Sequence, residues 1–309
     1  MKSLVLNPIL AKEFCSRMRN WKSPLMISLY LALLGLITLA YYWMQQKRGF
    51  YSGFGPDVGP QIFIILSVFQ LLLLSFVTPA LTAGVINGER ERQTFDLLLC
   101  TRLSSASIVL NKLLSSISYI LLLVIASLPV FAIVYFFGGV LLSDMGRVIL
   151  VSLATAITFG VIGIFCSTLF KRTQVSMVVS YVVVLLFLVG TLAVTVFLQG
   201  IGTGPNSQVT AQYFSYANPL VALFSIFPNH AAGVGIMSSF LGGYRTYGYN
   251  AAASQALSPW QYNFIFDGVL IIVLLLLTVF LLDPVGRFKR LRKNPAVVEI
   301  EAESSSVQG

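Results

Sequence analysis

Six long stretches of apolar residues divide this chain, and they constrain its fold more than any other feature of the sequence. They cover residues 24–44, 61–86, 113–138, 147–170, 174–198 and 262–282. A helix that crosses a lipid bilayer needs about 20 mainly apolar residues, and each stretch meets that length. Only 10% of the residues are charged, whereas a soluble domain has about 25%. We therefore predict an all-α integral membrane protein with six transmembrane helices.

Positive charge lies mostly on one side of the predicted membrane. Six spans place both termini on the same side, and sixteen of the 20 Lys and Arg residues fall there. The remaining four are Lys47, Arg48, Arg147 and Arg245. Because basic loops are retained in the cytoplasm, we predict cytoplasmic N and C termini in a multi-pass protein of the cell membrane. The net charge of +9 thus reflects topology, and no nucleic-acid partner is needed to explain it.

The first 22 residues are predicted to form a cytoplasmic helix along the membrane surface. Asn7 suits the N-cap position and Pro8 the first helical turn. Over residues 7–21, apolar side chains gather on one face and mainly basic ones on the other, as in helices that rest on anionic headgroups. The alternative, an amphipathic helix packed on a soluble domain, has no such domain in this chain. The residues expected to form this interfacial helix are Pro8, Leu10, Lys12, Glu13, Phe14, Arg17 and Trp21.

The remaining regions flank the last span. Residues 199–261 form the one long external segment, and within it residues 217–227 are apolar but too short to cross a bilayer. This short stretch is expected either to dip into the outer leaflet or to pack on the ends of the spans. The sixth span, at 262–283, is followed by a basic anchor and a disordered cytoplasmic tail at 284–309.

A charged segment, "NGERERQTFDLLLCTRLS" at 87–104, separates the second and third spans. Glu89 and Arg92 are three residues apart and Arg92 and Asp96 four apart, so on a helix each pair shares one face. The apolar stripe beside them consists of Phe95, Leu98 and Leu99. A short helix with a charged beginning and a leucine ridge suits docking into a groove of a cytosolic partner. The alternative is a solvated charge run followed by an early start of the third span.

The same segment resembles the region between the second and third spans of ABC-2 type transporter permeases. Many members share a pattern that begins G-E-x-E-x-x-T-x-x-L-L and continues to a proline and a serine; Arg102 stands where many relatives have the proline. The opening "LNPILAKEFCSRMRNWK" is similar to the N-terminal elbow helix of the same family. The residues that match the first pattern are Gly88, Glu89, Glu91, Thr94, Leu97, Leu98 and Ser104.

This resemblance implies a transmembrane subunit of an ATP-driven transporter, most often an exporter. It implies that segment 87–105 contains a coupling helix seated on separate ABC ATPase subunits, which bind the ATP and Mg²⁺. A second permease subunit, identical or homologous, completes the assembly, and the external segment forms short helices before the last span. The expected ATPase-coupling residues are Gly88, Glu89, Arg90, Glu91, Arg92, Thr94, Phe95, Asp96, Leu97, Leu98 and Leu99.

The chain is not expected to be catalytic by itself. A Walker A motif needs a lysine directly after a glycine, and none of the lysines follows one. We expect neither a cofactor nor a metal in this chain, since Cys15, Cys100 and Cys166 lack metal-ligand spacing. An intramembrane enzyme would need convergent acid, base or nucleophile pairs, which the sequence does not suggest. A proton-coupled secondary transporter would need a series of carboxylate or histidine residues inside the spans, and few such residues occur there. A membrane scaffold that only recruits partners remains an alternative.

Polar residues inside the spans are candidates for lining a transport pathway. Ser67, Gln70 and Thr78 share a face of the second span, and Thr155 lies on a small-residue face of the fourth. Close helix contact is the more common use of such residues in lipid, and pathway lining is the alternative. Asp267 is the best-placed charged residue; it either contributes to the pathway or is wetted near the external surface.

Overall fold

The computed structural model describes residues 21–48, 58–93, 105–136, 138–201, 213–227 and 257–282. Of the predicted interfacial helix, only Trp21 and Lys22 lie within these ranges; Trp21 is exposed, and Lys22 is the first residue of the helix that forms the first span. The leucine ridge of the charged segment, most of the external segment and the C-terminal tail lie outside the described residues.

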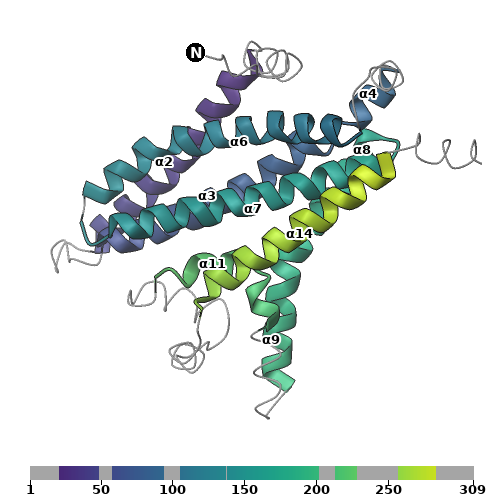
Figure 1. Cartoon of the computed structure of the whole chain (residues 1–309). Helices are drawn as coiled ribbons and strands as arrows, with labels where there is room; N and C mark the ends of the chain where they lie inside the picture. The colour runs from purple at the N-terminus through teal and green to yellow at the C-terminus, as the bar shows by residue number, and fades with distance from the viewer. Residues whose placement is uncertain are drawn as a thin grey trace, which may run out of the picture.

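Six membrane-spanning candidates confirm the predicted all-α membrane fold (Figure 1). Five are single helices: α2 (Lys22–Arg48), α3 (Val58–Thr82), α6 (Ser105–Phe136), α7 (Leu142–Leu169) and α14 (Pro259–Leu282). The fifth along the chain is interrupted, with α8 (Thr173–Leu185), a π-helical turn η2 (Leu186–Gly190) and α9 (Thr191–Ile201) in succession. Each overlaps a predicted span, and the described part of the chain contains no β-strand.

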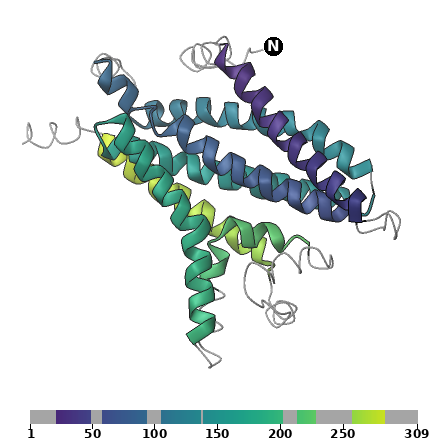
Figure 2. The same cartoon turned by 180° about the vertical axis from the view of Figure 1, so that it is seen from behind.

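Helix α7 lies at the centre of the bundle. It contacts α3, α6, α8 and α14, whereas α2 packs on α3 and α6 at one side. The outward faces of α2 and α14 carry exposed leucine and isoleucine side chains, among them Leu36 and Ile272. Such faces suit contact with lipid, because acyl chains solvate apolar side chains without penalty. Figures 1 and 2 show α9 diverging from this bundle beyond η2.

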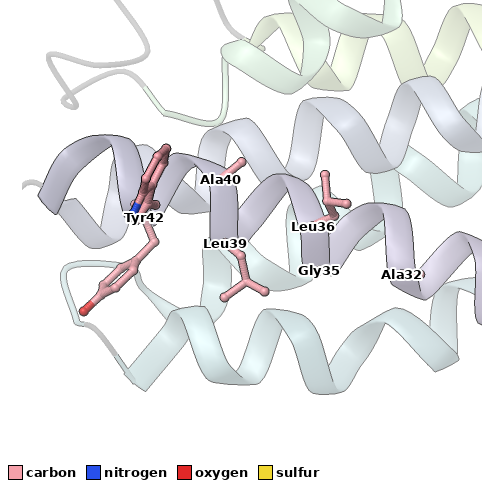
Figure 3. A pocket seen from close by; sticks show the side chains of 7 residues that line it. Ala32, Gly35, Leu36, Leu39, Ala40 and Tyr42 are labelled. Carbon is pink, nitrogen blue, oxygen red and sulfur yellow. The ribbon is translucent and has the colours of Figure 1, made fainter. Parts of the chain in front are cut away.

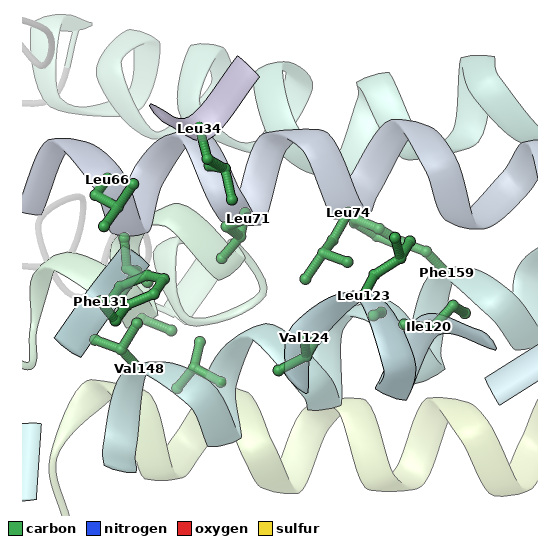
Figure 4. Packing of buried hydrophobic residues seen from close by; sticks show 14 of the residues in the cluster. Leu34, Leu66, Leu71, Leu74, Ile120, Leu123, Val124, Phe131, Val148 and Phe159 are labelled. Carbon is green, nitrogen blue, oxygen red and sulfur yellow. The ribbon is translucent and has the colours of Figure 1, made fainter. Parts of the chain in front are cut away.

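Interlocking apolar side chains hold the central helices together (Figure 4). Phe63 of α3 meets Phe131 of α6 edge to face, with ring centroids 5.4 Å apart. Since lipid removes the hydrophobic effect between spans, tight dispersion contacts of this kind must supply much of the stability. Other members of the cluster are Leu34, Leu66, Leu71, Leu74, Ile120, Leu123, Val124, Val148 and Phe159.

Helices α3 and α7 lie in close contact at two glycines of α7. A Cβ atom added at Gly163 would lie 2.0 Å from Thr82 Oγ1, and one at Gly160 would lie 3.4 Å from Thr78 Cγ2. Only hydrogen fits at Gly163 without movement of Thr82. The small-residue face of the fourth span therefore serves close helix contact in this structure, as is common in membranes.

Two short helices mark opposite ends of the bundle. Helix α4 (Asn87–Glu91), with residues 83–93 and 167–176 around it, forms what we call the α4 end. Helix α11 (Pro219–Phe224) packs on α3, α7 and α14 at the other end, which we call the α11 end. The apolar stretch 217–227 thus packs on the spans, the second of its two predicted arrangements. The prediction that the α4 end is cytoplasmic stays a prediction.

Candidate functional site

Helix α4 follows α3 after a tight turn and is shorter than the sequence predicts. It ends at Glu91, and Arg92 forms its C-cap. Gln93 then has a φ of 57°, which lies in the left-handed region that does not continue a right-handed helix. The helix that carries Glu89, Arg90 and Glu91 therefore ends before the leucine ridge begins. Thr94, Phe95, Asp96, Leu97, Leu98 and Leu99 lie outside the described residues.

Three consecutive charged residues of α4 bind three different helices. Glu89 forms an ion pair with Lys112 of α6. Arg90 Nη1 donates to the backbone oxygen of Thr168, in the last turn of α7, at 3.2 Å. Glu91 Oε1 accepts from the backbone N–H of Thr173, the first residue of α8, at 2.8 Å.

The last two contacts match the dipoles of the helices that they touch. A helix carries partial negative charge at its C-terminus and partial positive charge at its N-terminus. The Arg90 guanidinium meets the C-terminus of α7, and the Glu91 carboxylate meets the N-terminus of α8. The N-cap of α8, Arg172, makes no capping hydrogen bond with its own side chain, so the carboxylate of Glu91 takes over part of that role.

Two buried serines hold the backbone of the turn before α4. Ser167 Oγ of α7 accepts from the N–H groups of Ile86 and Asn87, at 3.0 and 3.1 Å. Ser176 Oγ of α8 donates to the carbonyl oxygen of Ala83 at 2.8 Å. Together with the three charged contacts, these bonds join α4 and the turn before it to α6, α7 and α8.

Sequence reasoning missed the residues that receive these contacts. None of these residues belongs to the predicted coupling segment; they are Lys112, Ser167, Thr173 and Ser176. Lys112 directly precedes the predicted third span at 113–138, where a lysine can face water, so it carried no signal of a buried partner. The two serines carried none, since serine is common in spans for reasons of helix contact.

The surface that the α4 end presents outward is basic. Arg92, Lys171 and Arg172 are exposed, and Glu91 is the one exposed acidic residue among them, whereas Glu89 and Arg90 are partly buried against the chain itself. Glu91 is exposed but binds the N-terminus of α8, so Arg92, the C-cap of α4, is the first charge after this helix that faces outward.

The polar residues predicted as pathway candidates are buried within the single chain. Ser67, Gln70, Thr78 and Thr155 are at most 2% exposed. Gln70 Nε2 of α3 donates to Ser127 Oγ of α6 at 3.2 Å. Their place between helices is compatible with the close-contact interpretation, and pathway lining stays a prediction.

Asp267 is also buried, at 6% exposed, on the face of α14 that packs against α7. One turn earlier on α14, Asn263 Nδ2 donates to the backbone oxygen of Tyr216 at 2.9 Å. The side chain of Asp267 is therefore shielded in this structure, in contrast to the wetted position that was one of the two expectations. Its contribution to a pathway stays a prediction.

A shallow apolar groove follows the outer side of α2 (Figure 3). Small side chains at Ala32, Gly35 and Ala40 leave space between Leu36, Leu39, Tyr42 and Trp43. All of these residues belong to one helix, and they offer few polar groups, so the groove suits an acyl chain or another helix better than a polar ligand. No three potential metal-binding side chains lie together within the described ranges.

Comparison with known families agrees with the geometry. A family model described as "ABC-2 family transporter protein" matches residues 8–290. The match includes the predicted interfacial helix from Pro8 onward, all six spans and the charged segment. The chain therefore belongs to the ABC-2 transporter family. No curated protein matches this chain.

Family membership defines the class of this protein. It is a multi-pass membrane protein, the permease component of an ABC transporter, and is not itself the catalytic subunit. Membership also implies ABC ATPase subunits and the lipid bilayer as its partners.

Proposed function

We propose that this permease is part of an exporter and that its α4 end is the cytoplasmic site at which ATPase subunits dock. ATP and Mg²⁺ would be bound by those subunits, and a second permease, identical or homologous, would complete the transporter. ATP binding would close the ATPase dimer and displace α4. The displacement would tilt the attached spans and open the interface between the two permeases.

The observation that carries this proposal is the attachment of one short helix to four spans. Helix α4 continues from α3 through a turn, and Glu89, Arg90 and Glu91 bind α6, α7 and α8. A force applied to a helix attached in this way reaches all four spans together. A solvated charge run, the alternative for this segment, has no need of three partners on three helices.

The predicted coupling residues then fall into two groups with different tasks. Glu89, Arg90 and Glu91 transmit the displacement within the permease, because their charges face its own helices. Arg92, which is exposed, and the leucine ridge that follows would form the contact with the ATPase. The end of α4 at Glu91 supports this division, because it falls between the two groups, and the positive φ at Gln93 then redirects the chain after Arg92.

Leu98→Asp tests the docking contact. A carboxylate in an apolar groove is strongly unfavourable, so we expect this variant to insert normally but to lose its ATPase partner during affinity purification. Any residual complex should hydrolyse ATP without transport. Leu257→Asp, at an exposed leucine of the α11 end, is the matched control and should retain the ATPase.

The proposal fails if the parent chain recovers no Walker-motif protein from membranes of its own host. It also fails if Leu98→Asp and Leu257→Asp recover equal amounts of ATPase and support equal transport.

A further inference from the structure

Asn218 caps helix α11 with a side chain that is fully buried. Its Oδ1 accepts from the backbone N–H groups of Leu220 at 2.8 Å and Val221 at 3.4 Å. Asparagine is among the preferred residues at the N-cap, and Pro219 after it suits the first helical position. This half of the side chain accounts for where α11 begins.

The other half of the same side chain binds the interrupted fifth span. Asn218 Nδ2 lies 2.9 Å from the carbonyl oxygen of Leu188, 3.2 Å from that of Phe187 and 2.6 Å from Thr191 Oγ1. An amide nitrogen has two hydrogens for these three acceptors, so one hydrogen is shared. Because backbone N–H groups surround Oδ1 and oxygen atoms surround Nδ2, the hydrogen bonds fix which end of the amide faces α11 and which faces the fifth span.

The π-turn explains why carbonyl groups are available there. In η2 the N–H of Thr191 donates to the oxygen of Leu186, five residues back, instead of four. This shift removes the regular α-helical donors of neighbouring carbonyls. Within a membrane protein such groups must find other partners, and Asn218 binds the carbonyl oxygens of Leu188 and Phe187 from 30 and 31 residues further along the chain.

The pinned turn separates a divergent helix from a well-packed region. Beyond η2, α9 diverges from the bundle (Figures 1 and 2), and its Val196 and Phe197 are exposed. Helix α11, in contrast, packs on α3, α7 and α14. Phe227, just after α11, meets Phe63 of α3 edge to face at 5.7 Å between ring centroids.

We propose that Asn218 is a positioning residue that pins the π-turn of the fifth span to α11 and thereby sets the direction of α9. While the amide binds Phe187 and Leu188, α9 is held in one orientation. When these bonds are released, α9 swings about η2 and changes the opening at the α11 end. The connection between Asn218 and η2 follows from the hydrogen bonds in the structure. A role for this connection in transport rests on the proposed function.

Asn218→Ser separates the two halves of the side chain. Serine still caps a helix but is too short to bind the carbonyls of η2. In the full-length chain in phosphatidylcholine–phosphatidylglycerol nanodiscs, we expect amide hydrogens of η2 to exchange about tenfold faster than in the parent. Amide protection in α11 should be unchanged.

A distance measurement reports the direction of α9 in the same variant. Spin labels are placed at Val196→Cys on α9 and Phe264→Cys on α14, both of which are exposed, in a chain whose native cysteines are replaced. The distance distribution should be broader in Asn218→Ser than in the parent. Thr191→Val removes one acceptor of the amide, together with the bond from Thr191 Oγ1 to the oxygen of Phe187, and leaves both carbonyl acceptors in place, so it should give an intermediate distribution.

Ser225→Ala is the matched control, because Ser225 Oγ bonds only within α11, to the oxygen of Ala222. It should match the parent in both measurements. Parent-like exchange and distances in Asn218→Ser would overturn the pin. Equal loss of protection in α11 and η2 would also overturn it, because the side chain would then act only by folding α11. These experiments need no ATPase, so a failure to bind ATPase would refute the proposed function and leave this result standing.

Discussion

At the α4 end a short helix is joined to its neighbours mainly through charged side chains, whereas at the α11 end a single neutral amide makes the corresponding connection. Glu89 and Lys112 keep 24% and 12% of their side chains exposed. Asn218 is 0% exposed. Each end attaches a short helix to spans that lie far from it in the sequence, but the two use different chemistry.

Access to water accounts for the difference. A charge withdrawn from water loses several kcal/mol of solvation, so ion pairs are best kept where hydration remains. A neutral amide loses much less and can satisfy backbone groups deep in the bundle. The α4 end should therefore respond to salt, and the α11 end should not. The following predictions test how strongly each end depends on its own contacts.

The largest effect is expected where α7 supports the α4 end. Gly163→Val would force a side chain against Thr82, since its Cβ would lie 2.0 Å from Thr82 Oγ1. Overpacking of this kind should lower the free energy of unfolding by about 3 kcal/mol, measured by thermal unfolding in detergent. Gly146→Val, near the other end of α7, meets nothing within 4 Å and should be neutral or slightly stabilising. Equal losses in the two variants would show that the close approach at the α4 end is not the cause.

A smaller loss is expected from Ser167→Ala. This variant leaves the buried N–H groups of Ile86 and Asn87 without their acceptor, which should lower the free energy of unfolding by about 2 kcal/mol. Ser75→Ala is the control, because Ser75 Oγ bonds only to Leu71 in its own helix. A stability of Ser167→Ala equal to that of Ser75→Ala would mean that the turn before α4 is held by other contacts.

The pair between Glu89 and Lys112 is expected to contribute less. A double-mutant cycle with Glu89→Gln and Lys112→Met should give a coupling energy of about 1 kcal/mol. The charge reversal Glu89→Lys with Lys112→Glu should recover part of the loss seen in either single reversal. A coupling energy of zero would remove this pair from the contacts that join α4 to α6.

The smallest effect is expected from Glu91→Gln. The amide oxygen still accepts from Thr173, and only the interaction of the charge with the N-terminus of α8 is lost. The melting temperature should fall slightly at low salt and match the parent at high salt, because the site is exposed and screened. The same titration of Asn218→Ser should show no salt dependence. Identical salt responses at the two ends would contradict the comparison between them.

Much of the fold could be predicted because the bilayer imposes local rules. Backbone groups within lipid must be satisfied inside each helix, so long apolar stretches are read directly as spans. The structure has a span over each of the six predicted stretches. The interruption of the fifth span was not predicted, because residues 186–190 are apolar throughout, so the change of helix face that an added residue causes leaves no mark on the hydrophobic pattern.

The candidate site could be predicted in position but not in its contacts. The spacing of Glu89 and Arg92 suggested a pair along one helix, whereas the structure shows an ion pair between Glu89 and Lys112 of α6. The partners of Glu89, Arg90 and Glu91 lie 23, 78 and 82 residues away along the chain. Helical periodicity describes only neighbours within a few residues, so it contains no information about such pairs.

The sequence by itself determined that this chain crosses a membrane six times and carries one conspicuously charged segment between its second and third spans. Hydrophobic length and residue identity are local properties, and lipid acts on them directly. Only the tertiary structure decided that three successive charges of that segment hold three different helices, and that Asn218 joins α11 to the break in the fifth span. These contacts depend on how helices meet in space, which is set by the shape of every side chain between them.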